Sequence, residues 1–327
     1  MFDLIIIGGS AAATTAGIYA TRRNLNFKII SKDFGGEVAT SGEIGNWPGD
    51  GTTDGITLAQ KFKDHLALYK VVPEEGIWVD KITKQNDGTF CITTKKDGSI
   101  TMAGEKIEEE TVRGLTCDYI AKTVLIATGV HPRELNVPGE KEYRNKGVSY
   151  CTTCDGPIFQ GKVVATIGGG NSALESGLML ADIASKVYVI NKNPEFKGDQ
   201  VLIDNLKSKK NVEIIYNAQT TKIVGEQFIT SLNYKDQAGA EQELKVDGIF
   251  VHIGMIPNSN LVPAEVGKNA FGEIKVNANC ETNIPGLYAA GDVTDVPFKQ
   301  IVIAAGQGCI ATLSAVQYLN KFSINPK

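Results

Sequence analysis

The chain has 327 residues, of which 42% are hydrophobic and 21% charged, and its formal net charge is −4 at pH 7. This length suits one large domain or two of medium size, and the composition is that of an ordinary globular protein. So small a negative charge gives no electrostatic reason to expect nucleic acid or an anionic membrane as a partner.

The N-terminal segment and the cysteines bear on the compartment. The apolar run in "MFDLIIIGGS" follows no basic segment and stops at a glycine, so no signal peptide is expected there. No apolar run approaches the ~20 residues that span a bilayer, so no membrane span is expected. Six cysteines are too few for a disulfide framework, and four that stand alone are expected to be free thiols: Cys91, Cys117, Cys280 and Cys309. The sequence therefore predicts a cytoplasmic protein.

The first predicted unit is a short β-branched strand at 4–7, a turn of small residues at 8–13 and a helix. The turn fits G-x-G-x-x-G/A with Ser10 in place of the second glycine, and only small residues allow a pyrophosphate to approach the helix N-terminus. A second strand is expected at 27–31, with Asp33 as a weak candidate for the ribose-binding acid. A hairpin with Asp-Gly turns at 87–88 and 97–98 and a buried strand at 123–129 follow.

Two cysteines three residues apart, Cys151 and Cys154, lie in "YCTTCDGPIF". Structural zinc needs four ligands, and the chain has no second pair and only three scattered histidines, so no metal is expected. An inert disulfide is unusual in the cytosol. A redox-active dithiol is therefore favoured, and a helix start lowers the pKa of a cysteine there.

A second copy of the first unit follows the dithiol. It has a strand at 163–167, a turn with Gly168, Gly170 and Ala173 in G-x-G-x-x-A, and a further strand at 186–191. One such turn could be a structural turn without a ligand, but two copies with matching downstream elements favour two dinucleotide sites. The matching elements of this copy are a hairpin around Gly239 and a buried strand that ends in glycine at 254.

The C-terminal stretch "GLYAAGDVTDVPFKQI" belongs with the first copy. It predicts a short strand, a turn at Gly291 and Asp292, and a long helix from near Ile303 whose positive end would face a flavin. We therefore expect an α/β protein with two Rossmann-like (three-layer ββα) dinucleotide-binding domains, the second inserted into the first. The expected bounds are 1–130 with 255–327 for the first dinucleotide-binding domain, and 131–254 for the second, which carries the dithiol.

Segments along the whole chain resemble the low-molecular-weight thioredoxin reductases and, to a similar degree, the flavoprotein core of alkyl hydroperoxide reductase. The matching segments are "IIIGGSAAATTAGIYATRR", "GGEVATSGEIGNWPG", "VLIATG", "YCTTCDGPIF", "IGGGNSALE", "GLYAAGDVTDVPFKQI" and "AAGQGCIA". The most specific of them is C-x-x-C-D-G followed closely by the second glycine fingerprint.

The resemblance implies FAD in the first domain, a nicotinamide nucleotide in the second, and a homodimer. The residues implied for FAD are Gly8, Gly9, Ser10, Ala12, Ala13, Asp33, Gly36, Asn46, Thr128, Gly129, Gly291, Asp292, Lys299, Gln300 and Ile301. Those implied for NADPH or NADH are Gly168, Gly170, Asn171, Ser172, Glu175, Asn191, Lys192 and Lys197.

The resemblance also assigns roles at the dithiol. Cys154 would face the flavin, Cys151 would attack the partner's disulfide, and Asp155 would move the proton as thiol and thiolate interconvert. A helix N-cap is the alternative for Asp155, and one residue can serve both purposes.

The expected activity is thioredoxin-disulfide reduction, in which hydride passes from NAD(P)H to FAD and electrons pass to Cys151–Cys154 and then to a thioredoxin-like protein. One alternative supplies a peroxiredoxin system, through a separate glutaredoxin-like carrier because the relative's thioredoxin-like N-terminal domain is absent from the sequence. Others are a ferredoxin-fed variant and a non-enzymatic redox sensor. The stretch "NKNPEFK" at 191–197 has neither the arginine cluster typical of NADPH enzymes nor an acidic residue at 191, so the nucleotide preference stays open.

Overall fold

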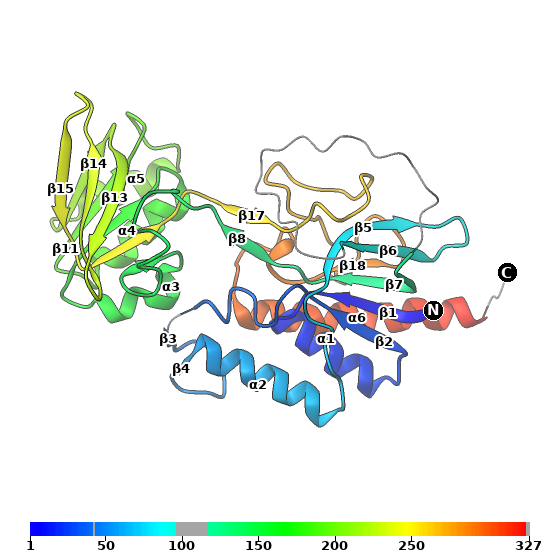
Figure 1. Ribbon diagram of the computed structural model, residues 1–327. Helices are drawn as coiled ribbons and strands as arrows, with labels where there is room; N and C mark the ends of the chain where they lie inside the picture. The colour runs from blue at the N-terminus through cyan, green and yellow to red at the C-terminus, as the bar shows by residue number, and fades with distance from the viewer. Residues whose placement is uncertain (42, 96–116, 325–327) are drawn as a thin grey trace. The chain divides into compact units, whose positions relative to one another are not determined.

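The computed structural model describes residues 1–41, 43–95 and 117–324, and the chain forms two compact units (Figure 1). Unit 1 comprises Met1–Thr40, Gly55–His131 and Pro257–Lys327, and unit 2 comprises Ser41–Asp54 and Pro132–Ile256. The two crossings lie within two residues of the boundaries expected at 130 and 255. Residues 41–54 differ from expectation, because their contacts group them with unit 2 instead of with the first domain. Within them, β3 (Glu43–Ile44) pairs with β4 (Thr53–Asp54).

Unit 1 is built on a six-stranded sheet in the order β2-β1-β7-β6-β5, with β18 also paired to β7. The strands are β1 (Phe2–Ile7), β2 (Phe27–Ile30), β5 (Trp78–Lys84), β6 (Phe90–Lys95), β7 (Tyr119–Ile126) and β18 (Leu287–Ala289). The pairs β1–β2, β1–β7 and β7–β18 are parallel, whereas β5–β6 and β6–β7 are antiparallel. The parallel part follows the first glycine-rich unit, and the antiparallel part contains the predicted hairpin.

Both faces of this sheet are buried, which explains why β1 is apolar over most of its length. Leu4 and Ile6 pack with helix residues on one face, and Ile5 and Ile7 pack with residues of β5 and β6 on the other. Side chains alternate across a strand, so a strand that is covered on both faces needs apolar residues at successive positions. The run of isoleucines that predicts the strand therefore also predicts that the strand lies in the interior of the sheet.

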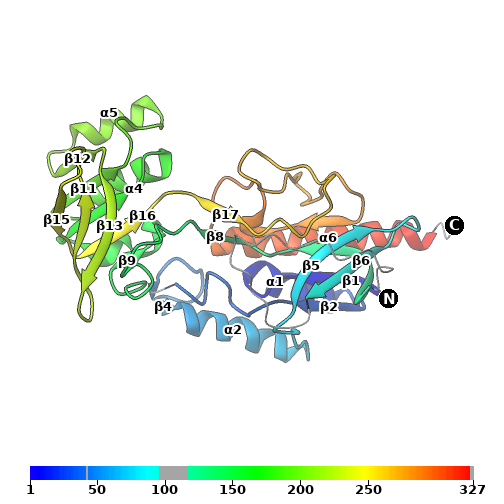
Figure 2. The same ribbon diagram turned by 45° about the horizontal axis from the view of Figure 1, so that its top comes forward.

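Two helices, α1 (Ala11–Arg22) and α6 (Ile301–Ile324), pack against each other on one face of the sheet (Figure 2). A third helix, α2 (Gly55–Leu68), also packs against α1. Small residues permit the α1–α6 contact, since a Cβ at Gly308 would lie 2.1 Å from the carbonyl oxygen of Ala12. This approach requires glycine.

The C-terminal helix corrects one expectation. By length and apolar composition α6 could cross a membrane, so the expectation that no such run exists is wrong. A core helix of a soluble protein meets the same criteria, and one face of α6 contributes buried Ala311 and Ala315 to the core shared with α1.

The hairpin turn at 87–88 is confirmed, with the backbone N–H of Gln85 donating to the carbonyl of Thr89 and Gly88 at a positive φ of 86°. The second turn expected in this region, at 97–98, lies outside the described residues.

A disulfide corrects the cysteine assignment. Cys91 and Cys117 were expected to be free thiols, but a disulfide joins them, with Cα atoms 5.3 Å apart. Cys91 lies on β6 and Cys117 lies two residues before β7, which is the neighbouring strand in the sheet. Pairing of strands brings together cysteines that are 26 residues apart in sequence, and no local pattern reveals it. Cys280 and Cys309 are free, as expected.

Unit 2 combines a parallel sheet, an antiparallel sheet and helices. The parallel sheet has the order β12-β11-β10-β16-β9, with β9 (Val148–Ser149), β10 (Val163–Ile167), β11 (Lys186–Asn191), β12 (Val212–Tyr216) and β16 (Gly248–Val251). The antiparallel sheet contains β13 (Gln219–Gly225), β14 (Ile229–Lys235) and β15 (Glu241–Lys245). The helices are α3 (Thr152–Asp155), the 3₁₀ turn η1 (Gly156–Phe159), α4 (Asn171–Ala181) and α5 (Gln200–Ser208).

Alternate residues of β10 show how these layers stack. Ala165 packs with Leu232 of the antiparallel sheet, whereas Val164 packs with Leu174 of α4 and Leu206 of α5. The parallel sheet therefore lies between helices and a second sheet, which is the predicted three-layer ββα arrangement. The chain crosses between the units through β8 (Val130–Pro132) and β17 (Met255–Pro257), and these two strands pair with each other.

Two glycines of α6 provide a matched test of the α1–α6 contact. In Gly308→Ala the new methyl would meet the backbone of Ala12, so we expect a loss of stability of about 1–3 kcal/mol. In Gly306→Ala no atom of the described residues of the same chain lies within 4 Å of the new methyl, so for the single chain we expect a gain of up to ~1 kcal/mol from helix propensity. Denaturant unfolding of both variants checks the signs, and a stabilised Gly308→Ala would contradict the close contact.

Candidate active site

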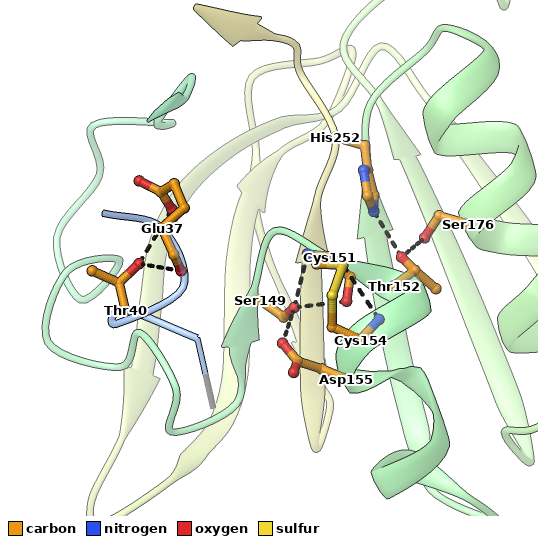
Figure 3. The surroundings of a disulfide bond; sticks show 9 residues. All are labelled: Glu37, Thr40, Ser149, Cys151, Thr152, Cys154, Asp155, Ser176 and His252. Atoms are coloured by element: carbon orange, nitrogen blue, oxygen red, sulfur yellow. Dashed lines mark hydrogen bonds between the residues drawn. A yellow bond between two sulfur atoms is a disulfide. The ribbon is translucent and has the colours of Figure 1, made fainter. Parts of the chain in front are cut away.

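The dithiol lies at the start of α3 in unit 2 (Figure 3). Cys151 and Cys154 form a disulfide, and both are partly exposed. Cys151 is the N-cap of the helix, and its sulfur accepts a hydrogen bond from the backbone N–H of Cys154 at 3.3 Å. A donor aimed at sulfur favours the thiolate. After reduction, Cys151 is therefore the sulfur with direct backbone support for its charge.

Asp155 is held by a serine beside the dithiol. The hydroxyl of Ser149, which is 5% exposed at the end of β9, donates to Oδ2 of Asp155 at 2.5 Å. The hydroxyl oxygen of Ser149 also accepts the backbone N–H of Cys151 at 3.1 Å. At the start of η1, Asp155 makes no side-chain capping bond, so the structure does not support the N-cap alternative there. Its carboxylate is instead fixed within the dithiol turn, where a proton could be exchanged.

A chain of side chains connects the dithiol helix with the second glycine turn. The hydroxyl of Thr152 is 2.7 Å from Nε2 of His252 and 2.6 Å from the hydroxyl of Ser176 on α4 (Figure 3). Burial lowers the pKa of His252 to about 4, so the imidazole is neutral at pH 7. The backbone of His252 also borders the glycine turn, where a Cβ at Gly168 would lie 2.2 Å from its carbonyl oxygen. No motif in the sequence indicates this contact, because Thr152 and His252 are 100 residues apart.

A buried carboxylate supports the segment before Cys151. Glu140 is 1% exposed, and its two oxygens each accept a backbone N–H at 2.7 Å, from Leu135 and Asn136. The hydroxyl of Tyr150, the residue before Cys151, donates to Glu140 at 2.9 Å. Burial, followed by this bond to a carboxylate, raises the pKa of Tyr150, so the phenol stays protonated. No local motif identifies Glu140, because it is 10 residues away from Tyr150.

The glycine turn of unit 2 leaves room for a phosphate. Gly168 has a φ of 151°, and a Cβ on Gly170 would have no atom of the described residues within 4 Å. Asn171 and Ser172 are exposed at the start of α4, an 11-residue helix whose N-terminus attracts anions. Glu175 is also exposed, on the first turns of the same helix. These residues fit a dinucleotide pyrophosphate.

The segment after β11 is arranged differently from the expected nucleotide contacts. Asn191 is 1% exposed, and its amide donates to the carbonyl of Glu195 at 2.8 Å while its oxygen accepts the N–H of Asn193 at 3.0 Å. The side chain therefore shapes its own loop. Lys192 and Lys197 are exposed, and the N–H of Lys197 donates to the carbonyl of Gly169, which holds this loop against the glycine turn.

The glycine turn of unit 1 is similarly tight. A Cβ at Gly8, whose φ is 133°, would lie 2.1 Å from the carbonyl oxygen of Ala127, and Ala12 and Ala13 are buried behind it on α1. The hydroxyl of Ser10 donates to the carbonyl of Gly35 at 2.6 Å, which explains how serine is accommodated.

The end of β2 offers an unused polar group beside this turn. The hydroxyl of Ser31 is buried without a hydrogen-bond partner among the described residues, and it would lie 2.9 Å from a Cβ at Gly9. Asp33, the expected ribose ligand, is exposed just beyond it. A polar group at the end of the second strand is where a dinucleotide places a ribose. Ser31, which the sequence reasoning did not include, therefore joins Asp33 as a candidate ligand.

The other residues expected at the first dinucleotide are spread over several elements of unit 1. Gly36 and Gly129 have positive φ angles, and Gln300 and Ile301 stand at the start of α6. The hydroxyl of Thr128 donates to the carbonyl of Asn258 at 2.7 Å. Asn46 is the exception, because it falls in the segment that groups with unit 2.

Asp292 follows Gly291, which has a φ of 77°, in the last glycine turn. Burial raises the pKa of Asp292 to about 6, although the nearby Lys299 acts against this rise and Glu37 adds to it. Lys299 itself binds Glu273 at 2.9 Å and the carbonyl of Thr294 at 2.6 Å. The carboxylate of Glu37 accepts a hydrogen bond from Thr40 at 3.2 Å (Figure 3).

Asp292 predicts a pH dependence of the flavin-free protein. An acid whose pKa is raised on folding stabilises the fold below its unfolded pKa of 3.8, and this stability is lost as the pH rises through about 6. Asp292→Asn should therefore gain on the order of 2–3 kcal/mol over the wild type at pH 8 and much less at pH 4. Denaturant unfolding at both pH values measures the difference in unfolding free energy between Asp292→Asn and the wild type. A difference that does not change with pH would contradict the raised pKa.

Comparisons with known proteins agree with this geometry. A family model described as pyridine nucleotide-disulphide oxidoreductase matches residues 2–308. In Escherichia coli (strain K12), the F subunit of alkyl hydroperoxide reductase is 41% identical over 320 residues, which cover 97% of this chain and 58% of that protein. NADH dehydrogenase of Bacillus subtilis (strain 168) is 38% identical over 319 residues, with 97% and 58% covered. The chain thus spans less than two thirds of the length of these relatives.

The solved structures extend the comparison to the fold. Thioredoxin reductase from Streptococcus pyogenes MGAS5005 is similar with a TM-score of 0.86 and 32% identity, covering 98% of this chain and 99% of that one. The family and this neighbour imply FAD and NAD(P)H as cofactors and a disulfide oxidoreductase as the enzyme class. The two glycine turns fit two dinucleotides. Beside the first, the hydroxyl of Ser31 has no hydrogen-bond partner among the described residues, and at the second, a Cβ on Gly170 would meet no described atom within 4 Å. The chain belongs to the pyridine nucleotide-disulphide oxidoreductase family.

Proposed function

We propose that the protein is an NAD(P)H-dependent thioredoxin-disulfide reductase that works through the Cys151–Cys154 pair. The observation that carries this proposal is the link between the dithiol helix and the second glycine turn: Thr152 is hydrogen-bonded to His252, and the carbonyl of His252 closely approaches Gly168. This link supports a nucleotide site in the same unit as the dithiol. Bound FAD would supply the step that converts hydride from the nucleotide into an electron pair for the disulfide.

Each residue of the dithiol turn has a separate role in the proposed reaction. Two electrons and one proton convert the disulfide into one thiol and one thiolate, and Asp155, positioned by Ser149, exchanges that proton. Cys151, with the Cys154 N–H directed at its sulfur, attacks the partner's disulfide. Cys154 then attacks the mixed disulfide, which restores Cys151–Cys154 and releases the reduced partner. In this scheme Cys154 is the sulfur that faces the flavin.

The protein partner is a thioredoxin-like domain. A second candidate function, reduction of a peroxiredoxin system through a glutaredoxin-like carrier, is favoured by the 41% identity to a component of alkyl hydroperoxide reductase. Both functions use the same dithiol and differ only in the acceptor.

A homodimer in the cytoplasm is part of the proposal. Val302 and Ile310 on α6 are 46% and 41% exposed, and with Gly306 between them they form an exposed stripe at helical spacing. A second copy of the chain would cover this stripe.

Two cysteine variants test the dithiol. Cys151→Ser and Cys154→Ser should each reduce NAD(P)H-dependent thioredoxin reduction to background, because neither can form the disulfide. Reduction of ferricyanide, which needs only the flavin, should continue in both. Cys309→Ser, a free cysteine outside the site, is the control and should retain both activities.

The acceptor decides between the two functions. Turnover with a bacterial thioredoxin supports the main proposal, whereas turnover only with a glutaredoxin-like carrier and a peroxiredoxin supports the second candidate. Full thioredoxin reduction by Cys151→Ser would overturn the role of the dithiol, and a flavin that neither nucleotide reduces would move the electron source to a ferredoxin-like donor.

Nucleotide preference should be modest. A charged hydrogen bond to a 2′-phosphate contributes about 1.5–3 kcal/mol, and lysines on flexible stems deliver the lower end. With Lys192 and Lys197 as the nearby cations, we expect kcat/KM values for NADH and NADPH within about a hundredfold. Asn193→Arg should shift the preference towards NADPH by about tenfold, whereas Lys192→Ala should shift it towards NADH.

Asn191 is a poor position for this test, because its amide holds Glu195 and a carboxylate there would disrupt the loop. Steady-state kinetics with both nucleotides gives the ratio of the kcat/KM values for NADH and NADPH directly. A wild-type preference beyond a thousandfold would show that other residues select the nucleotide.

A further inference from the structure

We propose that Cys91–Cys117 is a second, structural disulfide of unit 1, which stays oxidised while Cys151–Cys154 cycles. This proposal does not depend on the acceptor or on the nucleotide, and it assigns a lasting modification to two cysteines outside the active site.

The sheet brings the two cysteines together independently of their bond. The backbone N–H of Asp118 donates to the carbonyl of Ile92 at 3.0 Å, and its carboxylate accepts the N–H and the hydroxyl of Thr94 at 2.7 and 2.9 Å. These bonds fix the residue next to Cys117 against β6. The resulting Cα separation of 5.3 Å falls within the range that a disulfide requires.

Exposure differs between the two sulfurs. Cys91 is 1% exposed at the second position of β6, between the fully buried Phe90 and Ile92, whereas Cys117 is partly exposed. An external thiolate therefore reaches Cys117 first, and its attack would release Cys91 as a buried thiolate. Burial disfavours that charge, as it does at Cys280, whose pKa it raises to about 11. A leaving thiol of high pKa departs slowly, so reduction of this bond is slow.

The active dithiol has the opposite character. Both of its sulfurs are partly exposed, and Cys151 accepts an N–H bond that stabilises its thiolate. The enzyme therefore contains one disulfide suited to rapid exchange and one suited to persistence.

Formation of the second bond needs an oxidant, which we take to be a low-molecular-weight disulfide such as oxidised glutathione. The Cys117 thiolate attacks it, releasing one thiolate of the oxidant and forming a mixed disulfide. Cys91 then attacks the Cys117 sulfur and releases the second. Two thiols of the protein lose two electrons and two protons, and one molecule of the oxidant becomes two thiols.

Thiol counting in the full-length chain tests the proposal. In Cys151→Ser/Cys154→Ser, four cysteines remain, and we expect two titratable thiols after denaturation without reductant, from Cys280 and Cys309. After strong reduction the count should be four. Alkylation in intact cells before lysis prevents oxidation during purification, and peptide mapping should find the peptides of Cys91 and Cys117 linked. Four thiols in the alkylated, unreduced sample would overturn the proposal.

Thermal unfolding, followed by release of flavin fluorescence, tests the structural role. In the Cys151→Ser/Cys154→Ser background, Cys117→Ser should lower the Tm by on the order of 5 °C and remove the effect of reductant on it. The Cys151→Ser/Cys154→Ser parent in strong reductant should approach the same value, and Cys309→Ser in that background should match the untreated parent. An unchanged Tm in Cys117→Ser would show that the bond has no structural role, even where the thiol count confirms that it exists.

Discussion

Both units depend on one steric constraint, the absence of a Cβ at the first glycine of each dinucleotide turn. At Gly8 a Cβ would lie 2.1 Å from the carbonyl oxygen of Ala127, and at Gly168 it would lie 2.2 Å from that of His252. In each unit the turn leaves the first parallel strand and passes directly over the end of its neighbour. The helix that follows can then present its N-terminus to a phosphate. The same crossing brings His252 next to the turn, and through Thr152 it positions the dithiol helix as well.

Much of this arrangement could be predicted from sequence, because the relevant signals are local. The residues of Leu4–Ile7 alternate between two buried faces, which is why this run is continuously apolar, and Val163–Ile167 follows the same pattern apart from the buried Thr166. Glycines followed by small residues identify the turns, and Cys151 and Cys154 identify the dithiol without any knowledge of the fold. The duplication of the pattern then leads to two α/β units, one inserted in the other.

The remaining features depend on contacts between distant residues. The bonds of Glu140 to Tyr150 and of His252 to Thr152 span 10 and 100 residues, and both depend on the folded arrangement of unit 2. The pairing of Cys91 with Cys117 depends on the register between β6 and β7, which the sequence does not encode in a short pattern. Asn191 is a different case, since its place at the end of β11 predicts a nucleotide contact, and its hydrogen bonds to Glu195 and Asn193 show a second role in holding the loop, which the sequence pattern does not reveal.

The hydroxyl of Ser10 reinforces a connection that the backbone already makes, since the N–H of Gly35 donates to the carbonyl of Gly9 at 2.7 Å. Its own bond to the carbonyl of Gly35 is a second tie between the first glycine turn and the loop that continues into Gly36, so two of the segments proposed to bind FAD are joined before any ligand arrives. Ordering a loop during binding reduces affinity, whereas a loop already ordered in the free protein avoids that loss. The serine that departs from the glycine motif therefore preorganises the site and offsets part of what its added bulk costs at the phosphate.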